Sequence, residues 1–273
     1  FIITLPTPRI WAQTKGSSKT AGMPEFTLKY SSVTSAGSST ERYYVKPFAE
    51  WIKRESDNRI KLEYFPSGVL AKPPEIFDAV SRGLVDIAMG IGSYSPKVPE
   101  ADLETGLPFL PMSLNELFEL YTNYGLVDLF RETYAKFNIY YVNSVPSMEY
   151  RLFTKVPVTT LNDIKGKKLR ATGFLAKALQ AVGAVPVSIA GHEIYMAAQR
   201  GVVDGIAYPL WALESYKFKE VANYILTDNL GPTVVNFIVN MKVWNTLPKE
   251  YQEIIHRASV HATLLGIVGI NAE

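Results

Sequence analysis

The sequence predicts an α/β protein of two lobes that face one another across a hinge. One motif occurs twice, as EIFDAVSRGLVD at Glu75–Asp86 and as EIYMAAQRGVVD at Glu193–Asp204. The copies lie too far apart for a solenoid, whose repeats have periods of roughly 20 to 50 residues. Strand and helix patterns alternate along the chain, and strands are expected to cross between the lobes near residues 143–149 and 228–236. Two crossings form a hinge, which suits closure around a ligand.

Each copy of the motif predicts a short helix followed by a strand. Glutamate opens the segment and arginine closes it, the arrangement that suits the helix dipole. Gly83 and Gly201 then stand where a helix ends in a left-handed residue. The apolar runs Leu84–Met89 and Val202–Tyr208 follow as strands of an α/β layer.

Composition excludes several classes of function. The chain has 273 residues, 47% of them apolar, and its 28 basic and 26 acidic side chains nearly cancel. This balance does not suit a nucleic-acid partner, and the basic turn Lys165–Lys168 is expected to be solvated. Cysteine is absent, which excludes disulfides, thiolate metal sites and cysteine nucleophiles. No stretch is apolar over the roughly 18 residues that a membrane span needs.

Residues 1–25 are expected to lie outside the lobes, as a leader remnant or a disordered arm. Phe1–Leu5 is apolar but is followed by prolines, and TKGSSKTAGMP at Thr14–Pro24 is a flexible linker sequence. We expect the first lobe to comprise residues 26–143 and 236–273, and the second to comprise residues 144–235.

The first lobe begins with a strand, a hydroxyl-rich loop and a helix. FTLKYSS at Phe26–Ser32 alternates as a strand does, and the loop VTSAGSST follows it at Val33–Thr40. Glu41–Ser56 carries apolar residues at helical spacing. Backbone amides at such a helix start can meet an anion, although a capped surface helix is the alternative. Residues 60–66 form the next strand.

A glycine-bearing loop then follows a buried strand. Val85–Met89 is a strand, and Gly90–Tyr94 lies at its carboxyl end, the edge where open α/β sheets bind ligands. The loop has no third glycine and no following helix, so it is not a dinucleotide fingerprint. Ser113 should cap a helix that reaches about Phe137, and Asn138–Val145 is the strand that leads out of this lobe.

The second lobe contains the most informative charged residue. Glu149–Lys155 and Lys168–Thr172 are strands, and Phe174–Val182 is a helix. Arg170 therefore stands at a strand end beside a helix start, where arginine can hold a carboxylate through two hydrogen bonds. An exposed strand residue is the alternative.

Aromatic side chains follow the second copy of the motif. Tyr208 and Trp211 lie at the carboxyl end of a strand, where they could line a pocket or cap a core. Thr233–Met241 alternates and is expected to return to the first lobe, before a helix that starts near Leu247.

Several longer stretches, taken together, resemble the substrate-binding proteins of tripartite ATP-independent periplasmic (TRAP) transporters. The similarity runs from about Phe26 to the end of the chain. The matching stretches are FPSGVLAKPPEIFDAVSRGLVDIAMG (65–90), MEYRLFTKVPVTTLNDIKGKKLRAT (148–172), HEIYMAAQRGVVDG (192–205), FKEVANYILT (218–227) and NFIVNMKVWNTLP (236–248).

The resemblance implies the two-lobed periplasmic binding protein fold, type II-like, with a mixed sheet and flanking helices in each lobe and with hinge strands and a long helix between them. It implies a periplasmic protein, secreted through a signal peptide, that captures an organic acid and delivers it to the membrane subunits of a transporter. Arg170 matches the family's arginine that binds the ligand carboxylate, and Arg151 matches a second arginine of the family.

One departure from the family changes the expected pocket. Ile206, Ala207 and Tyr208 stand where the family commonly has polar or acidic residues, so a bridging metal ion is not expected. Aromatic walls are expected instead, and the ligand is then a carboxylate with a hydrophobic or aromatic body. The candidate ligand-binding residues are Arg170, Arg151, Tyr208, Trp211, Phe174, Ser32, Ser35, Ser93 and Tyr94.

Two other classes of function remain as alternatives. An enzyme on this scaffold would need a catalytic group, but His192, His256 and His261 show no triad or metal spacing, and no cofactor is expected. A ligand-sensing domain of a receptor or regulator would need a signalling or DNA-binding segment, and the sequence shows none.

Overall fold

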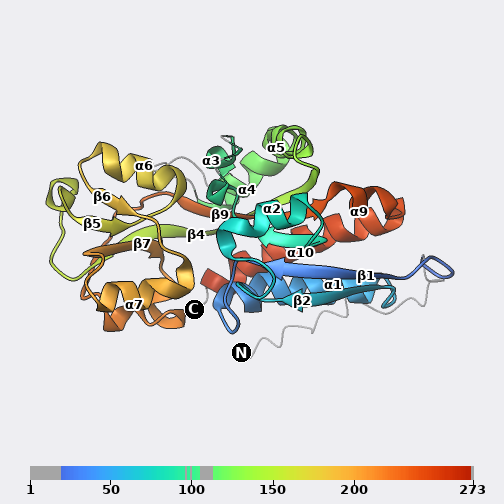
Figure 1. The fold of residues 1–273 in the computed structure, drawn as a ribbon, viewed down its shortest axis with the longest axis horizontal. Coiled ribbons are helices and arrows are strands. Elements are labelled where there is room, and N and C mark those ends of the chain that lie inside the picture. Colours follow the sequence, from blue (N-terminus) through green and yellow to red (C-terminus); the bar gives the residue numbers. More distant parts are fainter. Residues whose placement is uncertain (1–19, 96, 99, 105–112, 272–273) are drawn as a thin grey trace, which may run out of the picture.

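The computed structural model describes residues 20–95, 97–98, 100–104 and 113–271, and it contains two mixed β-sheets with helices packed against them (Figure 1). The first sheet has the strand order β2-β1-β3-β9-β4. β1 pairs in parallel with β2 and β3, whereas β9 pairs antiparallel with β3 and β4. The strands are β1 (Phe26–Ser32), β2 (Ile60–Phe65), β3 (Ile87–Gly90), β4 (Ile139–Thr154) and β9 (Pro232–Asn240).

The second sheet begins on the same strand β4 and has the order β4-β7-β5-β6, with β8 also paired to β4. β5 pairs in parallel with both neighbours, whereas β4 pairs antiparallel with β7 and β8. These strands are β5 (Lys168–Arg170), β6 (Val185–Val187), β7 (Gly205–Pro209) and β8 (Tyr224–Leu226). Two mixed sheets flanked by helices confirm the α/β two-lobed fold.

Helices cover both sheets (Figure 1). The α-helices are α1 (Lys46–Glu55), α2 (Ile76–Ser81), α3 (Ala101–Glu104), α4 (Leu114–Asn123), α5 (Leu126–Ala135), α6 (Gly173–Ala181), α7 (Ile194–Gln199), α8 (Ala212–Ser215), α9 (Met241–Thr246) and α10 (Lys249–Asn271). Shorter helical turns are η1 (Glu41–Val45), η2 (Pro73–Glu75), η3 (Gly92–Tyr94), η4 (Leu161–Ile164), η5 (Gly191–Glu193) and η6 (Phe218–Glu220). The long helix α10 packs against α1, η1 and β4.

The two copies of the motif fold alike. Gly83 has a φ of 77° and Gly201 a φ of 74°, the left-handed conformation expected after each helix. Asp86 accepts a hydrogen bond from the backbone of Lys29 at 2.7 Å, and Asp204 accepts one from the backbone of Lys168 at 2.8 Å. Each aspartate therefore links the end of its motif to a neighbouring strand, Asp86 to the middle of β1 and Asp204 to the start of β5.

Three boundaries differ from the sequence prediction. The expected strands 138–145 and 149–155 are one strand, β4, whose register shifts after Tyr141 and after Pro146. The helix expected from Ser113 to Phe137 is broken into α4 and α5 at Gly125, which has a φ of 79°. The strands of the two motifs start later than expected, because the segment after each glycine is a turn.

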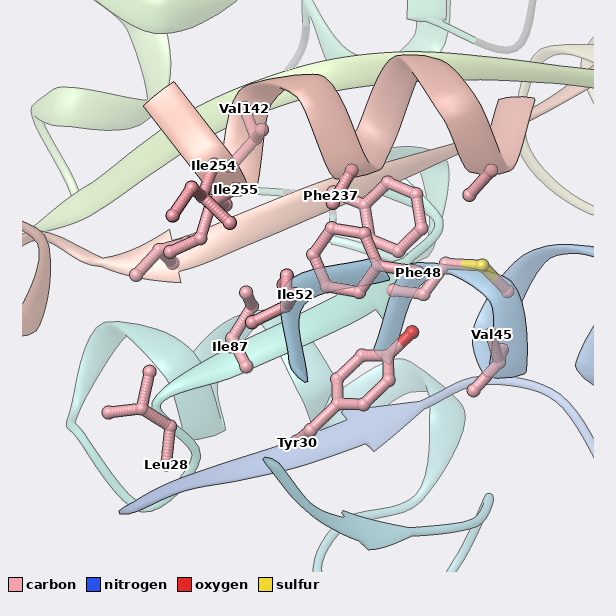
Figure 2. Close-up of a cluster of buried hydrophobic side chains, with 14 of the residues drawn as sticks. Leu28, Tyr30, Val45, Phe48, Ile52, Ile87, Val142, Phe237, Ile254 and Ile255 are labelled. Carbon is pink, nitrogen blue, oxygen red and sulfur yellow. The ribbon is translucent and has the colours of Figure 1, made fainter. Parts of the chain in front are cut away.

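The largest core lies between the first sheet and the helices α1 and α10, as Figure 2 shows. Phe48 of α1 stacks on Phe237 of β9 with ring centroids 4.1 Å apart. Ile52 and Ile255 are fully buried in the same cluster. This core packs β1, β3, β4 and β9 of the first sheet against α1 and α10.

The predicted lobe boundaries at 143/144 and 235/236 fall within β4 and β9, and they stay a prediction. Residues 1–19, most of the expected leader or arm, lie outside the described residues. None of the helices in the described part of the chain is long and apolar enough to cross a membrane.

Candidate functional site: a cleft beside a buried arginine

Arg170 is fully buried, with none of its surface exposed, and it lies where β5 of the second lobe ends. Its neighbour Leu169 is equally buried but belongs to the apolar core of that lobe. Successive strand side chains point to opposite faces, so the arginine is on the other face of the sheet. Arg170 is therefore outside the apolar core of this lobe, and because it is buried it is not the exposed strand residue that was the alternative.

Backbone carbonyls and aromatic rings hold the guanidinium of Arg170. Its Nε donates to the carbonyl of Ile189 at 2.9 Å, and one Nη donates to the carbonyl of Ala207 at 3.3 Å. The other Nη donates to the hydroxyl of Tyr94 at 3.4 Å. The guanidinium carbon lies 4.8 Å from the centre of the Tyr208 ring, within cation–π distance.

The surroundings keep Arg170 charged. Burial by itself opposes the charged form, but the phenol groups of Tyr94, Tyr208 and Tyr150 outweigh it, so the pKa of Arg170 is raised above its ordinary value. In the described part of the chain no carboxylate is recorded within ion-pair distance of this guanidinium. A buried cation of this kind attracts an anion strongly, because little solvent screens it.

Aromatic side chains form a wall next to the guanidinium. The ring centroid of Tyr208 lies 5.7 Å from those of Trp211 and Tyr216 and 5.5 Å from that of Phe218. Burial raises the pKa of Tyr208 well above its ordinary value, so the phenol remains a neutral donor. The indole Nε1 of Trp211 is buried without a hydrogen-bond partner in the described structure.

A cavity lies between this wall and the first lobe, with about 540 Å³ of empty space that includes open solvent. Residues of both lobes line it: Val33, Thr34, Thr40, Pro73, Ile91, Tyr94, Tyr150, Gly191, Tyr208, Pro209, Trp211, Tyr216 and Val235. The cleft is therefore built largely of tyrosines, hydroxyls and apolar groups.

Side-chain contacts close the cleft at its rim. The hydroxyls of Ser35 and Tyr216 lie 3.2 Å apart, and those of Ser39 and Ser215 lie 2.8 Å apart. Together with the contact between Tyr94 and Arg170, they join the hydroxyl-rich loop and η3 of the first lobe to the second lobe. The structure is thus a closed arrangement of the two lobes.

The structure gathers most of the predicted site residues here, though not all of them. Tyr94, Tyr208 and Trp211 line the cavity, Arg170 contacts two of them, and Ser35 contacts the lining residue Tyr216. These placements leave the roles of the residues in ligand binding as predictions.

Six predicted residues are not part of the cavity lining: Arg170, Ser35, Arg151, Ser32, Ser93 and Phe174. The Nη of Arg151 forms an ion pair with Glu149 at 2.7 Å. The hydroxyl of Ser32 lies 2.9 Å from the hydroxyls of Thr34 and Tyr64, one residue behind the lining. Ser93 lies in η3 and Phe174 at the start of α6, and both are half-buried. Their part in binding stays a prediction.

Sequence reasoning missed several lining residues. Tyr216 lies beyond the motif and its strand, and no pattern in the sequence marks it. The sequence did offer an indication of Tyr150, because this residue directly precedes Arg151. Its strand pairs with the strand of Tyr208. Thr34 and Thr40 belong to the hydroxyl-rich loop that was singled out only as a whole.

Residues 30–270 match the family described as bacterial extracellular solute-binding protein, family 7. The chain belongs to this family. The match confirms the resemblance of the sequence to TRAP solute-binding proteins.

The names of curated relatives in the family give different ligands. A monocarboxylate 2-oxoacid-binding periplasmic protein of Nostoc sp. is 29% identical over 260 residues, covering 92% of this chain and 70% of the relative. An ectoine/5-hydroxyectoine-binding periplasmic protein of Ruegeria pomeroyi is 27% identical, covering 80% of this chain and 65% of the relative. The chain thus spans about two thirds of the length of these relatives.

Solved structures share the fold. A Bordetella pertussis solute receptor binding pyroglutamic acid has a TM-score of 0.82 at 21% identity, covering 90% of this chain and 81% of its own. A TRAP solute-binding protein from Pseudoalteromonas atlantica with bound sodium and pyruvate has a TM-score of 0.79 at 24% identity, covering 91% and 79%. In the described residues here, no three histidine, aspartate or glutamate side chains come together as metal ligands. A site without a metal stays a prediction.

Proposed function

We propose that this protein captures a small organic acid anion in the cleft and delivers it, lobes closed, to the membrane component of a TRAP transporter. The observation that supports this most is Arg170, a fully buried cation whose recorded partners are two carbonyls and one hydroxyl. A guanidinium has five N–H donors, and carboxylates match its planar geometry. The remaining donors are therefore suited to a ligand carboxylate.

The lining supports an acid with one negative charge. The guanidinium of Arg170 contacts the side chains of two lining residues, Tyr94 and Tyr208. Arg151 reaches the lining at the backbone carbonyl of Tyr150, at 3.4 Å, but its charge is paired with Glu149. A second carboxylate on the ligand would lie among tyrosines and apolar groups, where its desolvation would be poorly compensated. Monocarboxylates should therefore bind more tightly than dicarboxylates.

The ligand also needs a neutral hydrogen-bond acceptor and an apolar body. The buried Nε1 of Trp211 can donate to a 2-oxo or 2-hydroxy oxygen, and leaving it unpaired costs free energy. The rings of Tyr208 and Tyr216 can pack against an aromatic or aliphatic chain. A relative in Nostoc is named as a binder of monocarboxylate 2-oxoacids, which is consistent with this chemistry.

The family consists of binding proteins without catalysis, and we infer the same for this chain and a location in the periplasm. A ligand-sensing domain is the second candidate, because it would use the same cleft. The two are distinguished by the cognate membrane subunits, which should bind the closed protein only if it is a transport component.

A thermal-shift screen tests the proposal, because a ligand that binds only the folded state raises the melting temperature. The panel contains pyruvate, lactate, phenylpyruvate, phenyllactate and succinate. We expect the 2-oxo and 2-hydroxy monocarboxylates to raise the melting temperature and succinate to raise it less. No shift with any acid, in protein shown to be free of copurified ligand, would contradict carboxylate capture.

A further inference from the structure

Glu104 is a buried carboxyl group that the proposed ligand contacts do not use. It ends the short helix α3, and none of its surface is exposed. Tyr134 donates to its Oε2 at 2.7 Å, and Asn236 donates to its Oε1 at 2.6 Å. The hydroxyl of Tyr141 donates to the same Oε1, and the backbone N–H of Gly92 donates as well. Four donors converge on one carboxyl group.

The donors come from elements that meet at the hinge. Tyr134 belongs to α5, Tyr141 to β4 and Asn236 to β9, and these two strands are the connections between the lobes. Gly92 opens η3, the turn that carries Tyr94. Glu104 therefore links both hinge strands to the turn that carries Tyr94.

Packing at Gly92 leaves no room for a side chain. A Cβ at this position would lie 1.9 Å from Oε2 of Glu104 and 2.3 Å from the hydroxyl of Tyr134. Glycine is thus required for the backbone of η3 to approach the carboxyl group. The position of η3, and with it Tyr94, depends directly on the Glu104 cluster.

The second lobe packs against the elements that carry Glu104 and Gly92. Helix α6 contacts both α3 and η3, and the hydroxyl of Tyr94 lies 3.4 Å from an Nη of Arg170. Figure 1 shows α6 at the side of the second lobe that faces α3. Opening of the lobes about β4 and β9 would withdraw α6 and Arg170, and the end of α3 would then meet solvent.

We propose that Glu104 is a positioning residue of the cleft, which holds η3 and Tyr94 against Arg170 in the closed lobes and couples closure to the uptake of a proton. It acts through its hydrogen bonds to Gly92, Tyr134, Tyr141 and Asn236, without touching the ligand. The proposal concerns closure itself, so it stands or falls separately from the identity of the ligand.

The burial of Glu104 determines whether closure of the lobes is favoured at low or at high pH. Burial, the largest effect, raises the pKa of Glu104 from 4.5 to about 7, although the hydrogen bonds from Tyr141, Tyr134 and Asn236 oppose it. In open lobes, water reaches the carboxyl group and its pKa falls back toward the ordinary value. The closed form therefore binds the proton more tightly, so closure weakens as pH rises from about 4.5 to about 7 and levels off above that.

The groups that face Glu104 do not titrate in this range. Burial raises the pKa values of Tyr121, Tyr134 and Tyr141 well above their ordinary value, and Asn236 and Gly92 carry no charge. Elsewhere in the first lobe, burial lowers the pKa of His256 to about 4, which leaves this histidine neutral near pH 7. His192 lies beside the lining residue Gly191 and needs a control of its own.

The experiment measures lobe closure without ligand. The chain has no cysteine, so Lys53→Cys on α1 and Gln199→Cys on α7 give a clean pair of labelling sites, both exposed. The distance between spin labels is measured by pulsed electron resonance at pH 5.0 and 7.5. We expect the ratio of closed to open protein to fall by up to about fiftyfold between these values.

Variants identify the group responsible. Glu104→Gln should remove the pH dependence, whereas Glu63→Gln, on the exposed edge of the first sheet, and His192→Gln should keep it. Tyr134→Phe removes one donor that lowers the pKa of Glu104, so it should move the midpoint to higher pH. A distance that does not change with pH, the same pH profile in Glu104→Gln, or an unmoved midpoint in Tyr134→Phe would overturn the proposal.

Discussion

Arg170 and Glu104 are two fully buried ionisable side chains, one in each lobe, and burial has different consequences for their charges. Arg170 lies among carbonyls and tyrosine rings that raise its pKa, so it stays charged. Glu104 receives four donors, yet burial still raises its pKa to about 7. Arg170 is a permanent cation in contact with two residues of the cavity lining, and Glu104 changes charge near neutral pH.

This difference in charge behaviour suits Arg170 and Glu104 to different roles. A cation that cannot lose its proton suits a site whose partner, the ligand carboxylate, arrives from outside. The hydrogen-bond partners of Glu104 all come from the protein itself, so this carboxyl group does not require a ligand. Its pKa, and therefore its charge near neutral pH, depends on how far water is excluded from it. Under the two proposals, the second lobe supplies the charge that binds the ligand, and the first lobe supplies the group whose protonation is coupled to closure.

The largest expected effect comes from removing the cation. Arg170→Ala should reduce carboxylate affinity by about 2 to 5 kcal/mol, as when one partner of a buried charged hydrogen-bonded pair is lost. Calorimetric titration with pyruvate measures it. Arg151→Ala is the matched control: its guanidinium is already paired with Glu149, so we expect a loss of less than about tenfold. Equal losses in the two variants would remove the distinction between the arginines.

The next effect is on stability. A raised pKa in the folded state means that the contribution of Glu104 is fully present below about 4.5 and is lost as pH rises to about 7. Glu104→Gln carries no charge, so its stability relative to the natural chain should increase by up to about 3 kcal/mol between pH 4.5 and pH 8. Urea unfolding at both pH values measures this. A stability difference that is independent of pH would show that Glu104 is not the titrating group.

A smaller effect concerns the aromatic wall beside Arg170. Tyr208→Ala and Trp211→Ala should each weaken phenylpyruvate by about 1 kcal/mol more than pyruvate, the usual size of an aromatic pair beyond its burial. Competition binding with both acids gives the difference. Equal losses for the two acids would mean that the ring of the ligand does not touch this wall.

The smallest effect is at the rim of the cleft. Ser35→Ala removes the contact with the hydroxyl of Tyr216 that joins the two lobes. One neutral hydrogen bond contributes about 1 kcal/mol, so pyruvate affinity should fall by roughly fivefold or less. A faster dissociation rate with an unchanged association rate is expected in stopped-flow measurements, and a slower association rate would argue against a role in holding the cleft closed.

Local patterns in the sequence were enough for most of the fold. The repeated motif, the glycines at 83 and 201 and the alternation of β1 and β9 each act through neighbouring residues, and their interpretation is confirmed. The continuity of β4 was missed, because Pro146 interrupts the pattern and the pairing with β9 spans it with a register shift. The break at Gly125 was missed because apolar spacing continues on both sides of it.

The candidate site was only partly accessible to sequence reasoning. Arg170 could be named because the end of a strand places it, and Tyr208 and Trp211 because they follow a strand. Tyr216 reaches the cavity only through the packing of α8 and η6, which no local pattern encodes. Glu104 was missed for the same reason: its donors lie on α5, β4 and β9, far from it in the chain.

The most direct test of the account compares one acid with its neutral counterpart. Pyruvate and pyruvamide differ mainly in the charge and the acceptor oxygens that Arg170 would bind. Calorimetric titration of the natural chain at pH 6 should show binding of pyruvate and an affinity for pyruvamide lower by roughly a hundredfold or more, as expected for a lost charged hydrogen-bonded pair. Comparable affinities for the two compounds would contradict the assignment of Arg170 as the group that captures a carboxylate.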